Sequence, residues 1–193
     1  RFEQKVMVSL ETPVCNFGMP AIEFTLRGVD SKVWTLDDCR GKNGLLVMFI
    51  CNHCPYVNAI LDRLIRDIRE MRHFGINTVA IMSNDPAEYP EDSFEQMQGI
   101  AGQQQFPFPY LFDETQQVAL KFGAVCTPDF FGFNRELELQ YRGRYDSTGR
   151  EESPPSDNKK DLYEAMKLIS KTQKGPEIQF SSIGCSLKWK EVN

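Results

Sequence analysis

The most constraining feature of this sequence is an unbroken apolar run, Leu45 to Ile50, with a long amphipathic segment after it. Such a run predicts a strand buried on both faces, as in a parallel sheet. After Pro55 the apolar residues recur with the helical period, and charged residues occupy the opposite face. Ile76 to Met82 then predicts a second buried strand. Residues 45–82 are therefore expected to form a β-α-β unit with a right-handed crossover.

The rest of the chain extends this unit with shorter segments of strand and helix pattern. Strands are predicted over residues 22–26, 32–36, 108–112, 129–133 and 138–145. Helices are predicted over residues 91–104 and 115–122, and a final one is predicted after a cap at Asp157. Irregular structure is predicted for residues 1–21, 37–43, 146–156 and 177–193.

The length of 193 residues fits a single domain over residues 1–193, with residues 177–193 as a C-terminal tail. Strands and helices alternate in the first half, and a hairpin and a helix close the second half. This order predicts an α/β fold, in which helices flank a central mixed β-sheet, with an N-terminal β-hairpin.

Charge and hydropathy exclude some classes of function. There are 22 basic and 27 acidic residues, a net charge of −5, and no basic stripe, so we expect no nucleic-acid partner. No apolar run is long enough to cross a bilayer, so we expect no membrane partner. No secretory signal is visible in Arg1 to Leu10. A cytoplasmic location is therefore expected, or a periplasmic or exported one if a signal was trimmed.

The chain has six cysteines, which are too sparse for a disulfide-stapled scaffold. Four of them stand singly, at Cys15, Cys39, Cys126 and Cys185. The other two, Cys51 and Cys54, form a Cys-x-x-Cys pair at the junction of the buried strand and the amphipathic helix. In an α/β chain such a pair indicates redox chemistry or a metal site.

The segment Cys51-Asn52-His53-Cys54-Pro55 has the features of a reactive thiol site. A thiol is nucleophilic as its thiolate, and the free amides at a helix N-terminus stabilise an anion. Pro55 is tolerated in the first helical turn, and His53 can add positive charge or a donor. A zinc site would use the two cysteines with His53, Cys126 or Cys185, but no second paired motif is present. We therefore expect no metal and no cofactor, and inert packing of the pair is the remaining alternative.

Several segments together resemble a known family: Gly44 to Pro55, Phe112-Asp113-Glu114, Gly123 to Pro128, the hairpin over 129–145, and Ile183 to Trp189. They are similar to the thioredoxin fold. More closely, they resemble the peroxiredoxin-like branch of the alkyl hydroperoxide reductase/thiol-specific antioxidant superfamily that carries Cys-x-x-Cys. The resemblance implies a thioredoxin-like fold, a redox-active disulfide, and an antioxidant role in cell redox homeostasis.

The resemblance also implies roles for individual residues. Cys51 takes the place of the attacking cysteine of thioredoxins and Cys54 that of their resolving cysteine, while Cys54 also matches the peroxidatic cysteine of peroxiredoxins. Pro128 takes the place of the cis-proline that faces the site. Thr127 would then offer backbone groups to an extended substrate segment. The pair His53-Cys54 is similar to that of strongly oxidising thioredoxin-fold proteins.

The chain departs from both family patterns at specific positions. Peroxiredoxins carry Pro-x-x-x-Thr-x-x-Cys, and here Val47 and Cys51 replace the Pro and the Thr. Thioredoxins carry a Trp before the first cysteine and a buried acid on the preceding strand, where this chain has Ile50 and Leu45. The arginine that assists a peroxidatic cysteine has three candidates: Arg135, Arg142 and Arg144.

Three hypotheses for function follow. The first is a thiol-disulfide oxidoreductase, in which Cys51 attacks a protein or small-molecule disulfide and Cys54 releases it. The second is a thiol peroxidase, in which Cys54 reacts with a hydroperoxide. The third is a non-enzymatic metal- or partner-binding module. Cys185 or Cys126 could be a third redox thiol, although tail anchoring and core packing explain them too. A thiol reductant and a homodimeric partner are also expected.

Overall fold

The computed structural model describes residues 8–151 and 155–191, and the predictions made for residues 1–7, 152–154 and 192–193 lie outside that range. The strands are β1 (Ser9–Glu11), β2 (Thr25–Gly28), β3 (Val33–Thr35), β4 (Gly44–Phe49), β5 (Ile76–Met82), β6 (Tyr110–Phe112), β7 (Cys126–Thr127), β8 (Asp129–Asn134), β9 (Leu139–Tyr141) and β10 (Ile183–Ser186). The helices are α1 (Leu36–Cys39), α2 (Pro55–His73), α3 (Phe94–Gln103), α4 (Gln117–Phe122) and α5 (Asp161–Thr172), with a 3-10 turn at Pro90–Asp92.

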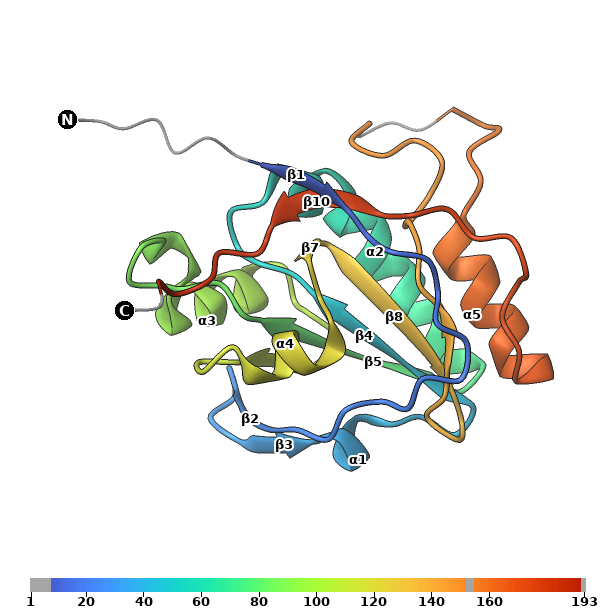
Figure 1. Cartoon of the computed structure of the whole chain (residues 1–193), viewed down its shortest axis with the longest axis horizontal. Coiled ribbons are helices and arrows are strands. Elements are labelled where there is room, and N and C mark those ends of the chain that lie inside the picture. Colours follow the sequence, from blue (N-terminus) through green and yellow to red (C-terminus); the bar gives the residue numbers. More distant parts are fainter. Residues whose placement is uncertain (1–7, 152–154, 192–193) are drawn as a thin grey trace.

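The described residues form a central seven-stranded sheet in the order β3-β2-β6-β5-β4-β8-β9 (Figure 1). Strand β4 lies inside it, parallel to β5 and antiparallel to β8. Helix α2 connects β4 to β5, as the sequence predicts for residues 45–82. The predicted α/β fold with a central mixed sheet is confirmed.

The sheet separates two apolar cores because successive side chains of a strand point to opposite faces. Leu46 and Met48 face the core shared with α2 and α5, while Val47 and Phe49 face the core shared with α1 and α4. Figure 1 shows α4 on one side of the sheet and α2 and α5 on the other. All residues of β4 are buried, so the position where this strand ends is well fixed.

Helix α2 begins directly after the cysteine pair. Cys54 is its N-cap residue and Pro55 its first residue, where the missing N–H has no helical partner to lose. The helix ends beside Gly75, which has a left-handed φ of 81° and donates its N–H to the carbonyl of Arg72. The start of this helix is therefore set by the sequence itself.

Two segments that the sequence predicts to be irregular contain strands instead. Strand β1 lies within residues 1–21 and β10 within the tail 177–193, and β10 pairs antiparallel with both β1 and β7. These strands form a second sheet of the described residues, β1-β10-β7 (Figure 1). A strand of four residues that gains its stability from distant partners has too weak a local pattern to be predicted.

Other boundaries also differ from the prediction. Helix α5 begins at Asp161, a few residues later than the predicted start directly after Asp157. The N–H of Ser147 bonds to the carbonyl of Lys159, and this holds the preceding segment in a loop. The strand predicted over 138–145 ends at Tyr141, since the N–H of Arg144 bonds to the carbonyl of Phe180. Most of helix α1 lies within the segment 37–43 that the sequence predicts to be a connector, and Thr35 caps this helix.

None of the helices in residues 8–151 and 155–191 combines the length and the apolar character that a membrane span requires.

The packing of β8 against α4 gives a prediction about stability. Phe131 is fully buried, with ring centroids 5.8 Å from Phe49 and 5.4 Å from Phe122. We expect Phe131→Ala to lower the free energy of unfolding by about 3–5 kcal/mol in urea denaturation, since it leaves a cavity. Leu120→Ala is the control, because Leu120 of α4 is 55% exposed, and it should change the free energy of unfolding by less than about 0.5 kcal/mol. Equal losses would contradict this description of the core.

Candidate active site at the start of helix α2

The two paired cysteines lie between the end of β4 and the start of α2, facing Thr127 of β7. The Thr127–Pro128 peptide bond is cis. The Sγ atom of Cys51 is 3.5 Å from the hydroxyl oxygen of Thr127, and the Sγ atom of Cys54 is 3.2 Å from its carbonyl oxygen. Cys51 is 2% exposed and Cys54 is fully buried, so in this form the site is closed to solvent.

Of the two candidates for a third thiol, one lies at the site. Strand β10 places Cys185 opposite Thr127, and the Sγ atoms of Cys185 and Cys54 are 3.0 Å apart. The Sγ atom of Cys126 is instead 3.6 Å from the carbonyl oxygen of Pro128, and burial raises the pKa of its thiol. The structure therefore brings three cysteine sulfurs together around Thr127.

The surroundings of Cys54 favour its thiolate. Hydrogen bonds with the side chains of Cys185 and Cys51 lower the pKa of Cys54 well below its ordinary value of 9.0, against the opposing effect of burial. Thr127 and the backbone N–H of Val57, in the first turn of α2, lower it further. The hydrogen bond to Cys54 is also the first cause that raises the pKa of Cys51 and of Cys185, followed by burial. Of the three thiols, Cys54 is therefore the one whose surroundings favour the thiolate.

A second polar cluster orders the loop between the two cysteines. The buried Asp92 accepts the backbone N–H of Asn52 at 2.8 Å and the side-chain amide of Asn84 at 2.9 Å. Its other contact is His53, whose Nδ1 is 2.7 Å from the carboxylate. The hydroxyl of Tyr110 donates to the side chain of Asn52 at 2.8 Å. These contacts fix the backbone that carries both sulfurs.

These contacts favour the protonated form of His53. Its hydrogen bond to Asp92 raises the pKa of His53 above the ordinary 6.5, although partial burial opposes this. The negative charge at Cys54 raises the pKa of His53 further. The His53 ring also stacks on Tyr89, with centroids 5.6 Å apart and an interplanar angle of 7°. The predicted role of His53 as a positive group near a thiolate is thus consistent with its surroundings.

Sequence reasoning missed Asp92, Asn84 and Tyr110. The sequence interpretation assigns Asp92 to the acidic start of a helix, because acids are common there. Asn84 follows β5, and Tyr110 is an apolar-looking member of β6. No local pattern connects these residues to the cysteine pair, since their contact depends on the way β5 and β6 lie beside β4.

The arginine candidates have other partners. Arg142 forms a buried ion pair with Asp129 at 2.9 Å, and Arg144 pairs with Asp161 at 2.8 Å. Arg135 is in the turn after β8, where its backbone N–H bonds to Gln173. These contacts therefore join the three arginines to residues other than Cys54.

A cavity of about 410 Å³ lies beside the cysteine cluster. Its walls include Tyr56 in the first turn of α2, Pro128, Ile183 of β10 and the loop 144–150. The cavity therefore lies between the helix start, the cis-proline and the loop 144–150.

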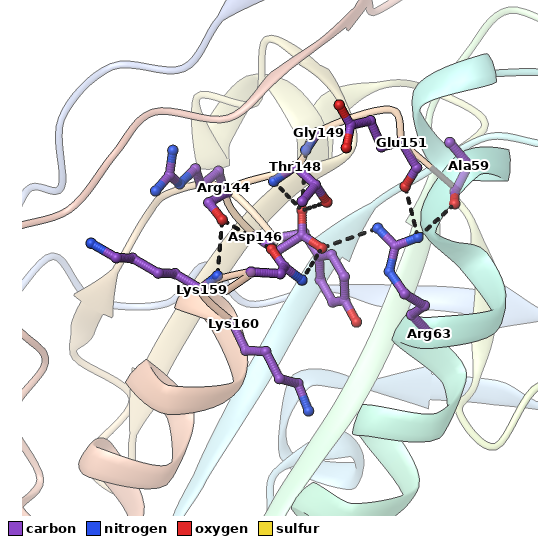
Figure 2. A network of polar contacts seen from close by, with 12 residues as sticks. Ala59, Arg63, Arg144, Asp146, Thr148, Gly149, Glu151, Lys159 and Lys160 are labelled. Carbon is purple, nitrogen blue, oxygen red and sulfur yellow. Dashed lines mark hydrogen bonds and ion pairs between the residues drawn. The ribbon is translucent and has the colours of Figure 1, made fainter. Parts of the chain in front are cut away.

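The loop that forms one wall of this cavity is held by Asp146, as Figure 2 shows. The Asp146 carboxylate accepts the backbone N–H groups of Thr148 and Gly149 and pairs with Arg63 of α2 at 3.0 Å. The Arg150 guanidinium lies 4.9 Å from the ring centroid of Tyr56. The wall is therefore fixed to the same helix that presents the thiolate.

Among the described residues, one set of donors lies close enough to hold a metal ion. One ligand atom each of Cys51, His53 and Asp92 lie within 4.8 Å of one another. Cys51 is held as a thiol by its hydrogen bond to Cys54, whereas a metal ligand must be a thiolate. In the present arrangement His53 pairs with Asp92, and Cys51 contacts Thr127 and Cys54.

A buried strand, a Cys-x-x-Cys pair at a helix start and a facing cis-proline together define a thioredoxin-fold protein, and the fold predicted from the sequence is confirmed. The AhpC/TSA family model matches residues 17–142. The chain belongs to the AhpC/TSA family.

Several solved structures have a similar fold. An uncharacterized conserved protein from Geobacillus kaustophilus is 39% identical, with a TM-score of 0.91 over 97% of this chain and 100% of that one. A hypothetical protein from Sinorhizobium meliloti is 33% identical, with a TM-score of 0.85 over 93% and 98%. A secreted disulfide oxidoreductase from Mycobacterium tuberculosis is similar in fold, with 14% identity and a TM-score of 0.51 over 61% and 80%. A comparison with curated proteins finds no match.

The contact between His53 and Asp92 predicts a pH-dependent stability. Because the folded state raises the pKa of His53, the contribution of the pair is complete below pH 6.5 and is lost as the pH rises through the raised value. We expect His53→Gln to lower the free energy of unfolding at acid pH and to have a smaller effect at alkaline pH. A difference from wild type that is constant with pH would contradict this.

An NMR titration of the His53 ring tests the cause directly. We expect a pKa above 6.5 in wild type and a lower one in Asp92→Asn. Asp37→Asn is the control, since Asp37 is 83% exposed and pairs with Arg40.

Proposed function

We propose that this protein is a thiol-disulfide oxidoreductase in which Cys54 is the nucleophile. The observation that carries the proposal is the position of the Cys54 sulfur, between two thiols and the first-turn amide of α2. The family resemblance implies the opposite order, with Cys51 as the attacking thiol. We favour Cys54 because its neighbours lower its pKa while they raise that of Cys51. The lower pKa makes Cys54 the thiol that more readily forms the attacking thiolate.

The reaction has two exchange steps. The Cys54 thiolate attacks one sulfur of a substrate disulfide, the bond between the substrate sulfurs breaks, and one substrate half leaves as a thiolate. Cys51 then loses its proton and attacks the Cys54 sulfur of the mixed disulfide. This forms the Cys51–Cys54 disulfide and releases the second half of the substrate. The protein gives up two electrons, and the substrate disulfide becomes two thiols.

A thiol reductant returns the protein to the dithiol form by the reverse exchange. A reducing cytoplasm would supply that reductant, and we keep this location as a proposal from the sequence. The cavity beside Pro128 is the proposed place for the body of the substrate. Its wall carries the Arg150 side chain and several hydroxyl and backbone groups, which suit a peptide or a small polar disulfide.

A thiol peroxidase is the second candidate. The lowered pKa of Cys54 favours it, together with the position of this cysteine before Pro55 as in peroxiredoxins. Against it, a cysteine stands where those enzymes have a threonine, and Arg142 is paired with Asp129. Stopped-flow consumption of hydrogen peroxide separates the two: a rate in wild type that Cys54→Ser abolishes would favour the peroxidase.

A metal-binding module is the third candidate, and its ligands would be Cys51, His53 and Asp92. Metal analysis of protein purified without a chelator tests it. A stoichiometric metal that Cys51→Ala removes would favour this role.

The exchange activity is tested by the reaction of the reduced protein with a small aromatic disulfide, followed by absorbance. We expect Cys54→Ser to abolish the initial attack. Cys51→Ser should retain it within about tenfold, because it removes only one of several groups that stabilise the thiolate. Cys126→Ser is the matched control, a buried cysteine whose sulfur contacts the Pro128 carbonyl, and should react like wild type. An attack that survives Cys54→Ser and disappears in Cys51→Ser would assign the nucleophile to Cys51 instead.

A further inference from the structure

Strand β10 occupies the edge of β7 that carries the cis-proline. Cys185 pairs with Thr127 and Ser186 with Cys126 in antiparallel register, and the N–H of Leu187 extends the ladder to the carbonyl of Val125. Figure 1 shows β10 lying between β1 and β7, close to helix α2. An exposed strand edge beside a reactive group is where an extended peptide can add by backbone pairing. Here the protein's own C-terminal segment fills that edge.

The fit of β10 at this edge depends on a glycine. A Cβ atom on Gly184 would overlap the carbonyl oxygen of Thr127, so residue 184 must be glycine for the two backbones to approach this closely. Residue 184 is buried, as is the cysteine that follows it. The close approach brings the Cys185 sulfur to 3.0 Å from that of Cys54.

The start of helix α2 holds both of these sulfurs. The backbone N–H of Val57 lowers the pKa of Cys54, and that of Tyr56 lowers the pKa of Cys185. Two adjacent amides of the first helical turn therefore stabilise negative charge on either sulfur. Cys185 occupies the place that a substrate cysteine would take: on an added strand, opposite Thr127, against the reactive sulfur.

We propose that Cys185 is a third redox thiol, which forms a disulfide with Cys54 and thereby fixes strand β10 over the site. The inference rests on the proposed function, in which Cys54 is the reactive thiolate. It adds that Cys54 is shared by two alternative disulfides, one with Cys51 and one with Cys185. In the second of these, the covalent bond closes the substrate edge.

Because Cys54 is fully buried, β10 must move away from Thr127 before a substrate disulfide reaches it. Cys54 attacks, and one substrate half leaves as a thiolate. When β10 returns, the thiol of Cys185 gives its proton to that thiolate and attacks the Cys54 sulfur. The bond from Cys54 to the substrate breaks, the second half leaves as a thiolate, and the Cys54–Cys185 bond forms. Two electrons pass from the protein to the substrate disulfide.

The test uses the reduced full chain with one equivalent of oxidised glutathione, followed by thiol blocking, digestion without reductant and mass spectrometry. In Cys51→Ser we expect a Cys54–Cys185 disulfide to replace the first-formed mixed disulfide at Cys54. In Cys185→Ser we expect Cys51–Cys54 alone, and in the control Cys126→Ser the pattern of wild type. A Cys51→Ser protein that keeps the glutathione on Cys54 would overturn this inference and leave the proposed function intact. No disulfide of any kind at Cys54, mixed or internal, in any variant would overturn both.

A second variant tests the role of the strand. In the Cys51→Ser background, Gly184→Ala should slow formation of the Cys54–Cys185 disulfide by at least about tenfold, because it displaces the attacking sulfur. Gly102→Ala is the control, since a Cβ there meets nothing within 4 Å. An unchanged rate in Gly184→Ala, with the fold verified by circular dichroism, would show that β10 does not deliver Cys185.

Discussion

The structure depends on one electrostatic arrangement: a sulfur anion held at the first turn of helix α2. Burial alone would raise the pKa of Cys54, and it does so for the isolated cysteines Cys39 and Cys126. Cys54 differs because its hydrogen bonds with Cys185 and Cys51, and then Thr127 and the Val57 N–H, lower its pKa. Hydrogen bonds to an ionised group are among the strongest in proteins, so together they exceed the penalty of burial. The same contacts hold Cys51 and Cys185 in their protonated forms.

The surrounding fold serves to position this anion. Strand β4, buried over its whole length between β5 and β8, fixes where the cysteine loop begins. Asp92 fixes the loop itself through Asn52 and His53. The second sheet brings Thr127 and Cys185 from the opposite side. Residues from widely separated parts of the chain therefore converge on one sulfur.

The sequence predicts the central part of this arrangement because its signals are local. The apolar run of β4, the period of α2 and the Cys-x-x-Cys pair lie within one continuous segment. The contact between Cys54 and Cys185 joins residues 131 positions apart, and that between Asn52 and Asp92 joins residues 40 apart. Neither has a pattern in the sequence, because both arise from strand order. The pairing of β10 was missed for the same reason, although Gly184-Cys185 is visible as a short motif within it.

The most direct test of this account is the ultraviolet absorbance of the thiolate in the fully reduced protein, titrated with acid. The account predicts one thiolate per chain that persists below about pH 6, where an ordinary cysteine is protonated. Cys54→Ser should abolish this absorbance, whereas Cys39→Ser, at a buried cysteine far from the helix start, should leave it unchanged. An absorbance that appears only near the pKa of free cysteine, or that persists in Cys54→Ser, would contradict the central claim.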